Sequence, residues 1–296
     1  MTVPSIVDSM RALIELSPAP DDTWVGDPGA LGLPRIFGGH VLAQSLLAAA
    51  RTVPPGRSAH SLHAYFLRAG DPARPITYRV KALRDGRRLS VREVTADQGD
   101  APIAVATLSF ADTDGVIAHQ RRPPVAVPAA ELPTLAEATQ RWGGLSPAWL
   151  GFDLLEMRVE PRQATVHDDI PQWTDHVWQR VPEALGEDPV LHQALLVYAS
   201  DVVQLAAALV PHGIALGREV VDGQLWDGVS LDHAIWFHRP ARADEWLLFE
   251  QVSPVAAAGR AYTRTEVFTA AGELVASIAQ EGLVFDPVEE TGVGRT

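Results

Sequence analysis

The longest hydrophobic stretch of the chain lies at residues 191–210, which read LHQALLVYASDVVQLAAALV. Its hydrophobic residues occur on almost every face of a helix, and such a helix is typically buried on all sides. An aspartate and a proline at 188–189 suit a helix start, and Pro-His-Gly at 211–213 suits its end. The pattern therefore predicts a buried helix over about 190–210.

One carboxylate, Asp201, lies inside this predicted helix, beside a narrow polar stripe formed by Gln193, Ser200 and Gln204. Burying a carboxylate is costly unless the group is paired or used. Two interpretations follow. Asp201 either bonds a nearby backbone or hydroxyl group and only shapes the core, or it is a catalytic carboxylate in a sheltered binding site.

A second, mostly hydrophobic helix is expected over about 39–52, because Gly38 and Gly39 open it and Pro-Pro-Gly at 54–56 ends it. Glycines at a helix start leave backbone N–H groups accessible to an anion, and His40 could add a donor there. Alternatively, the glycines only allow close packing and His40 is solvated.

Strands dominate the rest of the first half. Alternating hydrophobic positions between turn residues predict strands at Ser61–Leu67, Ile76–Arg84, Leu89–Gln98 and Ile103–Phe110. Before the first helix, a short amphipathic helix is expected near 6–14 and a loop at 17–34. Residues 113–150, rich in proline and glycine, are interpreted as a linker between two domains, 1–112 and 151–296.

The second half repeats the plan of the first, with a strand at Leu154–Glu160, loops over 162–188, the buried helix and then further strands. Phe66 and Arg68 match Phe237 and Arg239 at an offset of 171, and Val105-Ala106 matches Val275-Ala276 at an offset of 170. A near-constant offset indicates a duplicated domain. The predicted fold class is therefore α+β, a double hotdog in which each of two long buried helices is wrapped by an antiparallel sheet.

Composition narrows the function classes. The chain of 296 residues contains no cysteine, so disulfides, thiolate metal sites and cysteine nucleophiles are excluded. Its net charge of −13 argues against nucleic acid as a partner. No hydrophobic run is long and uninterrupted enough to predict a membrane span, and the first residues do not resemble a secretory signal. We therefore expect a cytoplasmic protein.

One segment, 51–92, is locally basic, with ten basic and two acidic residues. It is either a solvated face that pairs with acidic residues elsewhere or a binding surface for a small polyanion such as a nucleotide phosphate. In the second case Arg87 and Arg88 are candidate substrate-binding residues, together with Arg84 and Arg92.

Several catalytic motifs are absent, including G-x-S-x-G, the phosphate-binding glycine loops and H-E-x-x-H. The histidine pairs near 60 and 233 are expected to face opposite sides of a strand, so no metal site is predicted. Polar residues of the second half attract more attention: Asp201, Ser230 and Gln280. Gln280 interrupts a hydrophobic strand near the position that Phe110 takes in the first half.

Four stretches resemble the type II acyl-CoA thioesterases, the TesB-like family: RIFGGHVLAQSLLAAA, HSLHAYFLRAGDPARPITYRVKALRDGRRLSVREV, LDHAIWFHRPARADEWLLFE and VASIAQEGLVF. The resemblance covers about residues 30–112 and 150–286. It implies the double hotdog fold and hydrolysis of fatty acyl-CoA to a free fatty acid and CoA, without metal or cofactor. It also implies that Asp201, Ser230 and Gln280 hold the attacking water. The chain has His40 where the family usually has glutamine.

The expected mechanism is water attack on a thioester with Asp201 as the base and a backbone N–H at a helix start polarising the carbonyl group. Gly38, Gly39, His40, Arg87 and Arg88 are the candidate substrate-binding residues for acyl-CoA. We expect a homo-oligomer.

Two alternatives are retained. One is a hotdog hydratase or dehydratase, which needs a closely set aspartate and histidine. On its own predicted helix, Asp201 is followed by no histidine until the terminal His212. The other alternative is a non-catalytic acyl-CoA-binding protein of the same fold.

Overall fold

The computed structural model describes most of the chain. The described residues are 10, 14–29, 31, 33–112, 115–140, 143–145, 149, 152, 154–159, 174–212, 214, 216–217, 220–221, 224–225, 228–284 and 288–289. The N-terminal amphipathic helix predicted near 6–14 falls mostly outside these residues. Of its hydrophobic positions, Met10 and Ile14 are described, and both are buried.

The first half begins with a hairpin and continues as a helix followed by strands. Its elements are β1 (Leu16–Ala19), β2 (Thr23–Gly26), α2 (Gly38–Ala50), β3 (Ser58–Phe66), β4 (Ile76–Asp85), β5 (Leu89–Gln98) and β6 (Ala101–Ala111). The expected strands and the helix near 39–52 are therefore observed, with small differences at their ends.

The segment 115–159 and the second half supply the remaining elements. They are η1 (Ala129–Glu131), α3 (Leu135–Thr139), β7 (Glu156–Val159), β8 (Thr174–Arg180), α4 (Pro189–Val202), η4 (Leu205–Ala208), η5 (Val210–His212), β9 (Val220–Val221), β10 (Gln224–Leu225), β11 (Gly228–Ser230), β12 (Asp232–Phe237), β13 (Leu247–Ala257), β14 (Arg260–Thr269), β15 (Leu274–Val284) and β16 (Val288–Glu289). Asp188 caps α4 by accepting a hydrogen bond from the Val190 N–H.

Antiparallel pairing joins most strands into one 13-stranded sheet, in the order β1-β2-β4-β5-β6-β3-β12-β15-β14-β13-β8-β7, with β11 also paired to β15. The halves meet where β3 pairs with β12, for example Tyr65 opposite Asp232. The protein is thus α+β, with a large antiparallel sheet and few helices among its described residues. This confirms the predicted class at that level.

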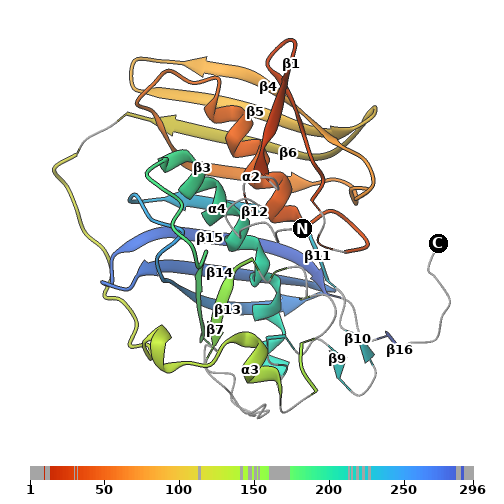
Figure 1. Ribbon diagram of the computed structural model, residues 1–296, viewed down its shortest axis with the longest axis vertical. Helices are drawn as coiled ribbons and strands as arrows, with labels where there is room; N and C mark the ends of the chain where they lie inside the picture. The colour runs from red at the N-terminus through yellow and green to blue at the C-terminus, as the bar shows by residue number, and fades with distance from the viewer. Residues whose placement is uncertain are drawn as a thin grey trace, which may run out of the picture.

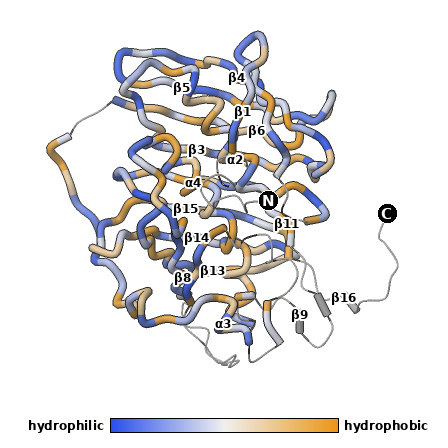
Figure 2. Tube along the Cα trace, in the orientation of Figure 1, coloured by the Kyte–Doolittle hydropathy of each residue, from blue (hydrophilic) through white to orange (hydrophobic). Residues whose placement is uncertain are grey.

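The helices α2 and α4 pack against each other inside the curved sheet (Figure 1). α2 also contacts β3 to β6, and η4 contacts β13 and β14. Figure 2 shows hydrophobic residues along both helices, whereas the turns between the strands of the first half are largely hydrophilic. Burial on all sides explains why both helices lack a polar face.

The helix predicted over 190–210 is too long. α4 ends at Val202, and two short 3₁₀ segments, η4 and η5, follow it. Just after α4, the Gln204 side-chain amide forms hydrogen bonds with two threonines of β14. The next residue, Leu205, packs against Gly228 and Gly282. Tertiary contacts hold the tighter turn, which hydrophobic periodicity alone does not reveal.

Two other predictions were wrong. Residues 17–34 were expected to form a loop, but 16–26 form the β1–β2 hairpin, which extends the sheet beyond β4. Residues 162–188 were also expected to be loops, whereas β8 (Thr174–Arg180) lies between β13 and β7. In the hairpin, the strands are only four residues long and bury few side chains, so their period-two pattern is weak.

Strand pairing relates the two halves with a shift of two residues from the predicted alignment in one strand. Phe66 pairs with Ala104 and Phe237 pairs with Ala276, so β6 matches β15 at an offset of 172 rather than 170. Arg68 and Arg239, at the end of each matching strand, make equivalent hydrogen bonds to Pro102 O and Leu274 O. Leu108, not Phe110, is consequently the residue that corresponds to Gln280.

Candidate active site

A cavity of about 470 Å³ lies where the start of α2 meets the ends of β3 and α4 and the strand β11. Its walls are mainly hydrophobic. Four polar or charged residues line it: Arg35, Arg68, Asp201 and Ser230. Such a lining, apolar with a few convergent polar groups, is typical of a small-molecule site.

Asp201 reaches this cavity from the last turn of α4 and is only 8% exposed. Burial raises the pKa of its carboxyl group above the usual range. The neighbouring His233, the Gln280 side chain and the Gly39 backbone N–H oppose this effect because each stabilises the carboxylate. Its Oδ1 accepts no hydrogen bond from the residues that the structure describes.

The paired glycines of α2 face this carboxylate. A Cβ placed on Gly38 would lie 2.7 Å from Oδ2 of Asp201, so a larger residue would displace the acid. Gly39 contributes its N–H to the same carboxylate. The helix start, which we expected to bind a substrate anion or polarise a carbonyl group, thus serves at least in part an anion of the protein itself.

Gln280 and Ser230 complete the predicted set. Gln280, on β15, is fully buried, and its Nε2 donates a hydrogen bond of 2.6 Å to Ser230 Oγ. The same side chain lies beside Asp201. Three polar groups that are far apart in the sequence therefore come together beside the cavity: Asp201 and Ser230 line it, and Gln280 lies behind them.

The sequence reasoning missed His233, which lies on β12 and is completely buried. Its Nδ1 is 2.6 Å from Gln280 Oε1 and 3.9 Å from Asp201 Oδ1. A histidine close to the aspartate therefore exists, although it comes from a strand and not from the helix. The signal was present in the period-two pattern, because His233 and Ile235 share the buried face of β12.

A second network supports the backbone of the site. Gln204 donates from Nε2 to Thr263 Oγ1 at 3.1 Å and accepts from Thr265 Oγ1 at 2.7 Å. Thr263 Oγ1 in turn donates to the Gln280 carbonyl oxygen at 3.3 Å. These buried bonds tie the end of α4 to β14 and β15, so that the spacing between Asp201 and Gln280 is held from both sides.

His40 does not line the cavity. Its ring is buried, and Nε2 lies 2.7 Å from the Asp27 carbonyl oxygen. Burial lowers the pKa of the imidazole, which favours its neutral form. The alternative interpretation, in which His40 is solvated, was wrong, because the segment before α2 folds over it. Its role in substrate binding, like that of Gly39, stays a prediction.

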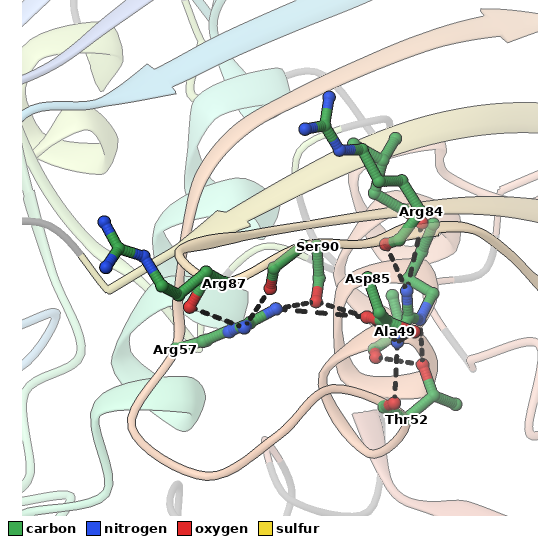
Figure 3. Close-up of polar contacts among 10 residues, drawn as sticks. Ala49, Thr52, Arg57, Arg84, Asp85, Arg87 and Ser90 are labelled. Carbon is green, nitrogen blue, oxygen red and sulfur yellow. Dashed lines mark hydrogen bonds and ion pairs between the residues drawn. The ribbon is translucent and has the colours of Figure 1, made fainter.

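Arg87 and Arg88 lie in the turn between β4 and β5, at the far end of the sheet from the cavity. β3 runs from Ser58, beside this turn, to Phe66, at the cavity. Arg57 donates to the carbonyl oxygens of this turn, at 2.6 Å to Gly86 and 3.2 Å to Arg87, and Figure 3 shows the contact with Arg87. Within one chain the two arginines do not line the cavity, so their proposed contact with substrate stays a prediction.

Arg92, another residue of the basic segment, is buried inside the first half. It donates to Thr52 and to both carboxylate oxygens of Asp85. In the strand pairing, Arg92 lies opposite Leu108 just as Thr263 lies opposite Gln280 in the second half. The Arg92 guanidinium therefore occupies, in the first half, the position of the threonine network. The idea that Arg92 meets a CoA phosphate was therefore wrong, since its donors are used internally.

Comparisons with known proteins agree on one family. The Acyl-CoA thioesterase family matches residues 154–283, and the Acyl-CoA thioesterase N-terminal domain matches residues 27–111. The chain is 32% identical to human acyl-coenzyme A thioesterase 8, over 93% of this chain and 88% of that protein.

Solved structures give the same answer. The chain resembles the acyl-CoA thioesterase II TesB2 of Mycobacterium marinum at 36% identity, with a TM-score of 0.76 over 97% of this chain and 100% of that one. A hot dog fold protein from Alicyclobacillus acidocaldarius, 18% identical with a TM-score of 0.72 over 95% and 99% of the two chains, supports the fold alone. From its sequence, fold and cavity, the chain belongs to the acyl-CoA thioesterase family.

Proposed function

We propose that this protein hydrolyses fatty acyl-CoA to a free fatty acid and CoA with a water held by Asp201, Ser230 and Gln280. The observation that carries the proposal is that Asp201 and Ser230 line one largely hydrophobic cavity, while Gln280, behind this lining, bonds Ser230 and lies beside Asp201. Membership of the thioesterase family agrees with it.

In the proposed reaction the water oxygen attacks the thioester carbonyl carbon while Asp201 accepts the water proton. The C–S bond of the tetrahedral intermediate then breaks, and the CoA sulfur leaves and takes up a proton. Oδ1 of Asp201 suits the role of base, since it accepts no hydrogen bond from the described residues. Ser230 and the Gln280 amide would orient the water relative to this oxygen.

The two ends of the substrate suit two kinds of surface around the site. Hydrophobic walls, which include Phe37 and Leu205, suit an acyl chain. Arg35 and Arg68 line the same cavity and provide positive charge for the phosphates of CoA. The acyl group and CoA would therefore meet at Asp201.

The architecture behind this function is, in our proposal, a double hotdog divided into 1–112, a linker at 113–150, and 151–296. The equivalent bonds of Arg68 and Arg239 and the antiparallel sheet around α2 and α4 support it. We further propose a cytoplasmic homo-oligomer. One helical segment, Pro189–His212, is long and hydrophobic enough to span a membrane, but 78% of its hydrophobic window is buried within the protein. That burial favours a core helix.

The distance of 3.9 Å between Asp201 and His233 favours one runner-up, a hydratase or dehydratase. Such chemistry needs the histidine to reach the substrate. His233 is completely buried, does not line the cavity, and bonds Gln280 and Ser200 through its two nitrogens. Hydrolysis is accordingly the function that the geometry supports better.

Release of free thiol from a panel of acyl-CoA esters of increasing chain length tests the proposal, with Asp201→Asn as the inactive control. Thioesterase activity predicts thiol release that this substitution abolishes. Saturable acyl-CoA binding without thiol release would instead support the binding protein. If an enoyl-CoA ester, added to the panel as a hydratase substrate, lost its absorbance without thiol release, the hydratase would be supported.

A further inference from the structure

A chain of buried hydrogen bonds leads away from the cavity and ends inside α4. It begins at Ser230 Oγ, passes through Gln280 to His233, and continues to Ser200 Oγ, 2.9 Å from His233 Nε2. Ser200 Oγ also lies 2.8 Å from the Val197 carbonyl oxygen, so its single hydroxyl proton serves either that oxygen or His233 Nε2. The hydrolytic mechanism uses only the cavity end, so the buried histidine and serine need another explanation.

The chemistry of a side-chain amide gives that explanation. Gln280 must present its NH₂ group, and not its oxygen, toward Ser230 and the nearby carboxylate of Asp201, because two oxygens without a proton between them repel. With Nε2 committed to Ser230, Oε1 is the atom 2.6 Å from His233 Nδ1. An amide oxygen only accepts hydrogen bonds, so Nδ1 of His233 must carry the proton and donate it.

We propose that His233 is a positioning residue that fixes the orientation of the Gln280 amide, and that Ser200 holds the ring of His233 in place. The inference rests on the proposed hydrolytic function and names residues that the function itself does not require. His233 touches neither the cavity nor the substrate, so it acts through Gln280.

The fold supports this division of labour. Ser200 directly precedes Asp201 on α4, so one helical turn carries both the base and the residue that holds His233. His233 lies three residues after Ser230, and the strands that carry them, β12 and β11, both pair with β15, the strand that carries Gln280.

The test introduces His233→Asn and His233→Leu separately into the wild-type protein and into the Gln280→Ala variant. His233→Asn keeps an N–H donor near the position of Nδ1, and His233→Leu removes it. We expect His233→Leu to lower kcat by about tenfold or more with KM nearly unchanged, and His233→Asn to recover most of this loss. In a Gln280→Ala background the two substitutions should have no further effect on kcat, because the amide through which they act is gone.

His192→Leu provides the matched control. His192 is also buried and also bonded through both nitrogens, but its partners, Gly186 O and the Ala243 N–H, do not belong to the proposed catalytic set. It should lower the melting temperature and leave kcat per folded molecule intact. A merely structural His233 would behave in the same way, and an equal loss of kcat in both Gln280 backgrounds would likewise overturn the proposal.

NMR of the ¹⁵N-labelled imidazole gives a readout that needs neither activity nor a stable His233→Leu variant. We expect His233 in the wild-type protein to carry its proton on Nδ1 and a hydrogen bond from Nδ1 to the Gln280 amide. An unprotonated Nδ1 in the folded protein would refute the inference. Failure of the wild type to release thiol would refute the proposed function alone, so the two failures are distinguishable.

Discussion

Gly38 and Asp201 are so close that no side chain fits between them: a Cβ on Gly38 would lie 2.7 Å from the carboxylate oxygen Oδ2. Gly38 does not have a positive φ angle, so an alanine there would not strain the main chain itself. The glycine is required by the positions of the Asp201 carboxylate and the Phe66 ring, which is equally close at 2.7 Å, and not by its own backbone angles.

Gly38→Ala should therefore lower kcat/KM by about tenfold or more, because the methyl group displaces the base from its productive position. The measurement is steady-state thiol release, combined with circular dichroism to verify folding. Gly115→Ala is the control, since nothing lies within 4 Å of its added Cβ. Equal activity of the two variants would show that Asp201 can move without loss of function.

Asp201→Asn should lower kcat by roughly 10²–10⁴ while the protein remains folded, because the substitution keeps the shape of the side chain but removes the base. Ser230→Ala and Gln280→Ala should each cost less, and their combination should cost less than the sum, because both groups position one water. Kinetics and melting curves on the same preparations are required. A lower melting temperature with intact turnover would assign Asp201 a structural role only.

The pH dependence should report the raised pKa of Asp201. Only the carboxylate accepts a proton, so kcat/KM should rise with pH through an apparent pKa above the ordinary value of 3.8. The stability effect has the opposite sign. Between 3.8 and the raised pKa, the unfolded chain loses its proton more easily than the folded one, so the wild type loses stability as pH rises.

Asp201→Asn removes this penalty. The difference in melting temperature between the variant and the wild type should hence grow with pH across that window and become constant above it. Melting curves at closely spaced pH values measure it. A difference that is the same at every pH would mean that burial does not raise the pKa of Asp201.

Leu205→Ala should change the acyl preference. The Leu205 side chain lines the cavity and packs against Gly228 and Gly282, where an added Cβ would lie 2.7 and 2.6 Å away. Truncation enlarges the pocket at this wall, so longer or branched acyl-CoA esters should gain in kcat/KM relative to short ones. Leu247→Ala, at a buried leucine that does not line the cavity, should reduce stability with no change in chain-length preference.

Charge reversal at two arginine pairs, one pair at a time, tests where CoA binds. Replacing Arg35 and Arg68, which line the cavity, with glutamate should raise the KM for acyl-CoA esters most strongly at low salt. The same change at Arg87 and Arg88, at the far end of the sheet, should have no such effect unless a neighbouring subunit brings this turn to the cavity. Measurement of KM against protein concentration and salt separates these cases.

Much of the local structure could be predicted from the sequence. The hydrophobic run with its cap at Asp188 located α4, and the turn residues between alternating positions located β3 to β6. These features depend on neighbours within a few residues, where propensity and periodicity act. The repeat, with the family resemblance, also singled out Asp201, Ser230 and Gln280.

Tertiary structure decided which groups surround these residues. His233 reaches Gln280 through strand register, across 47 positions in the sequence, and Gly38 reaches Asp201 through the packing of α2 on α4. The repeat alignment was off by two residues in β6, which assigned Phe110 instead of Leu108 to the position of Gln280. Periodicity shows which face of a strand is buried, but only the pairing of strands determines which buried side chains meet.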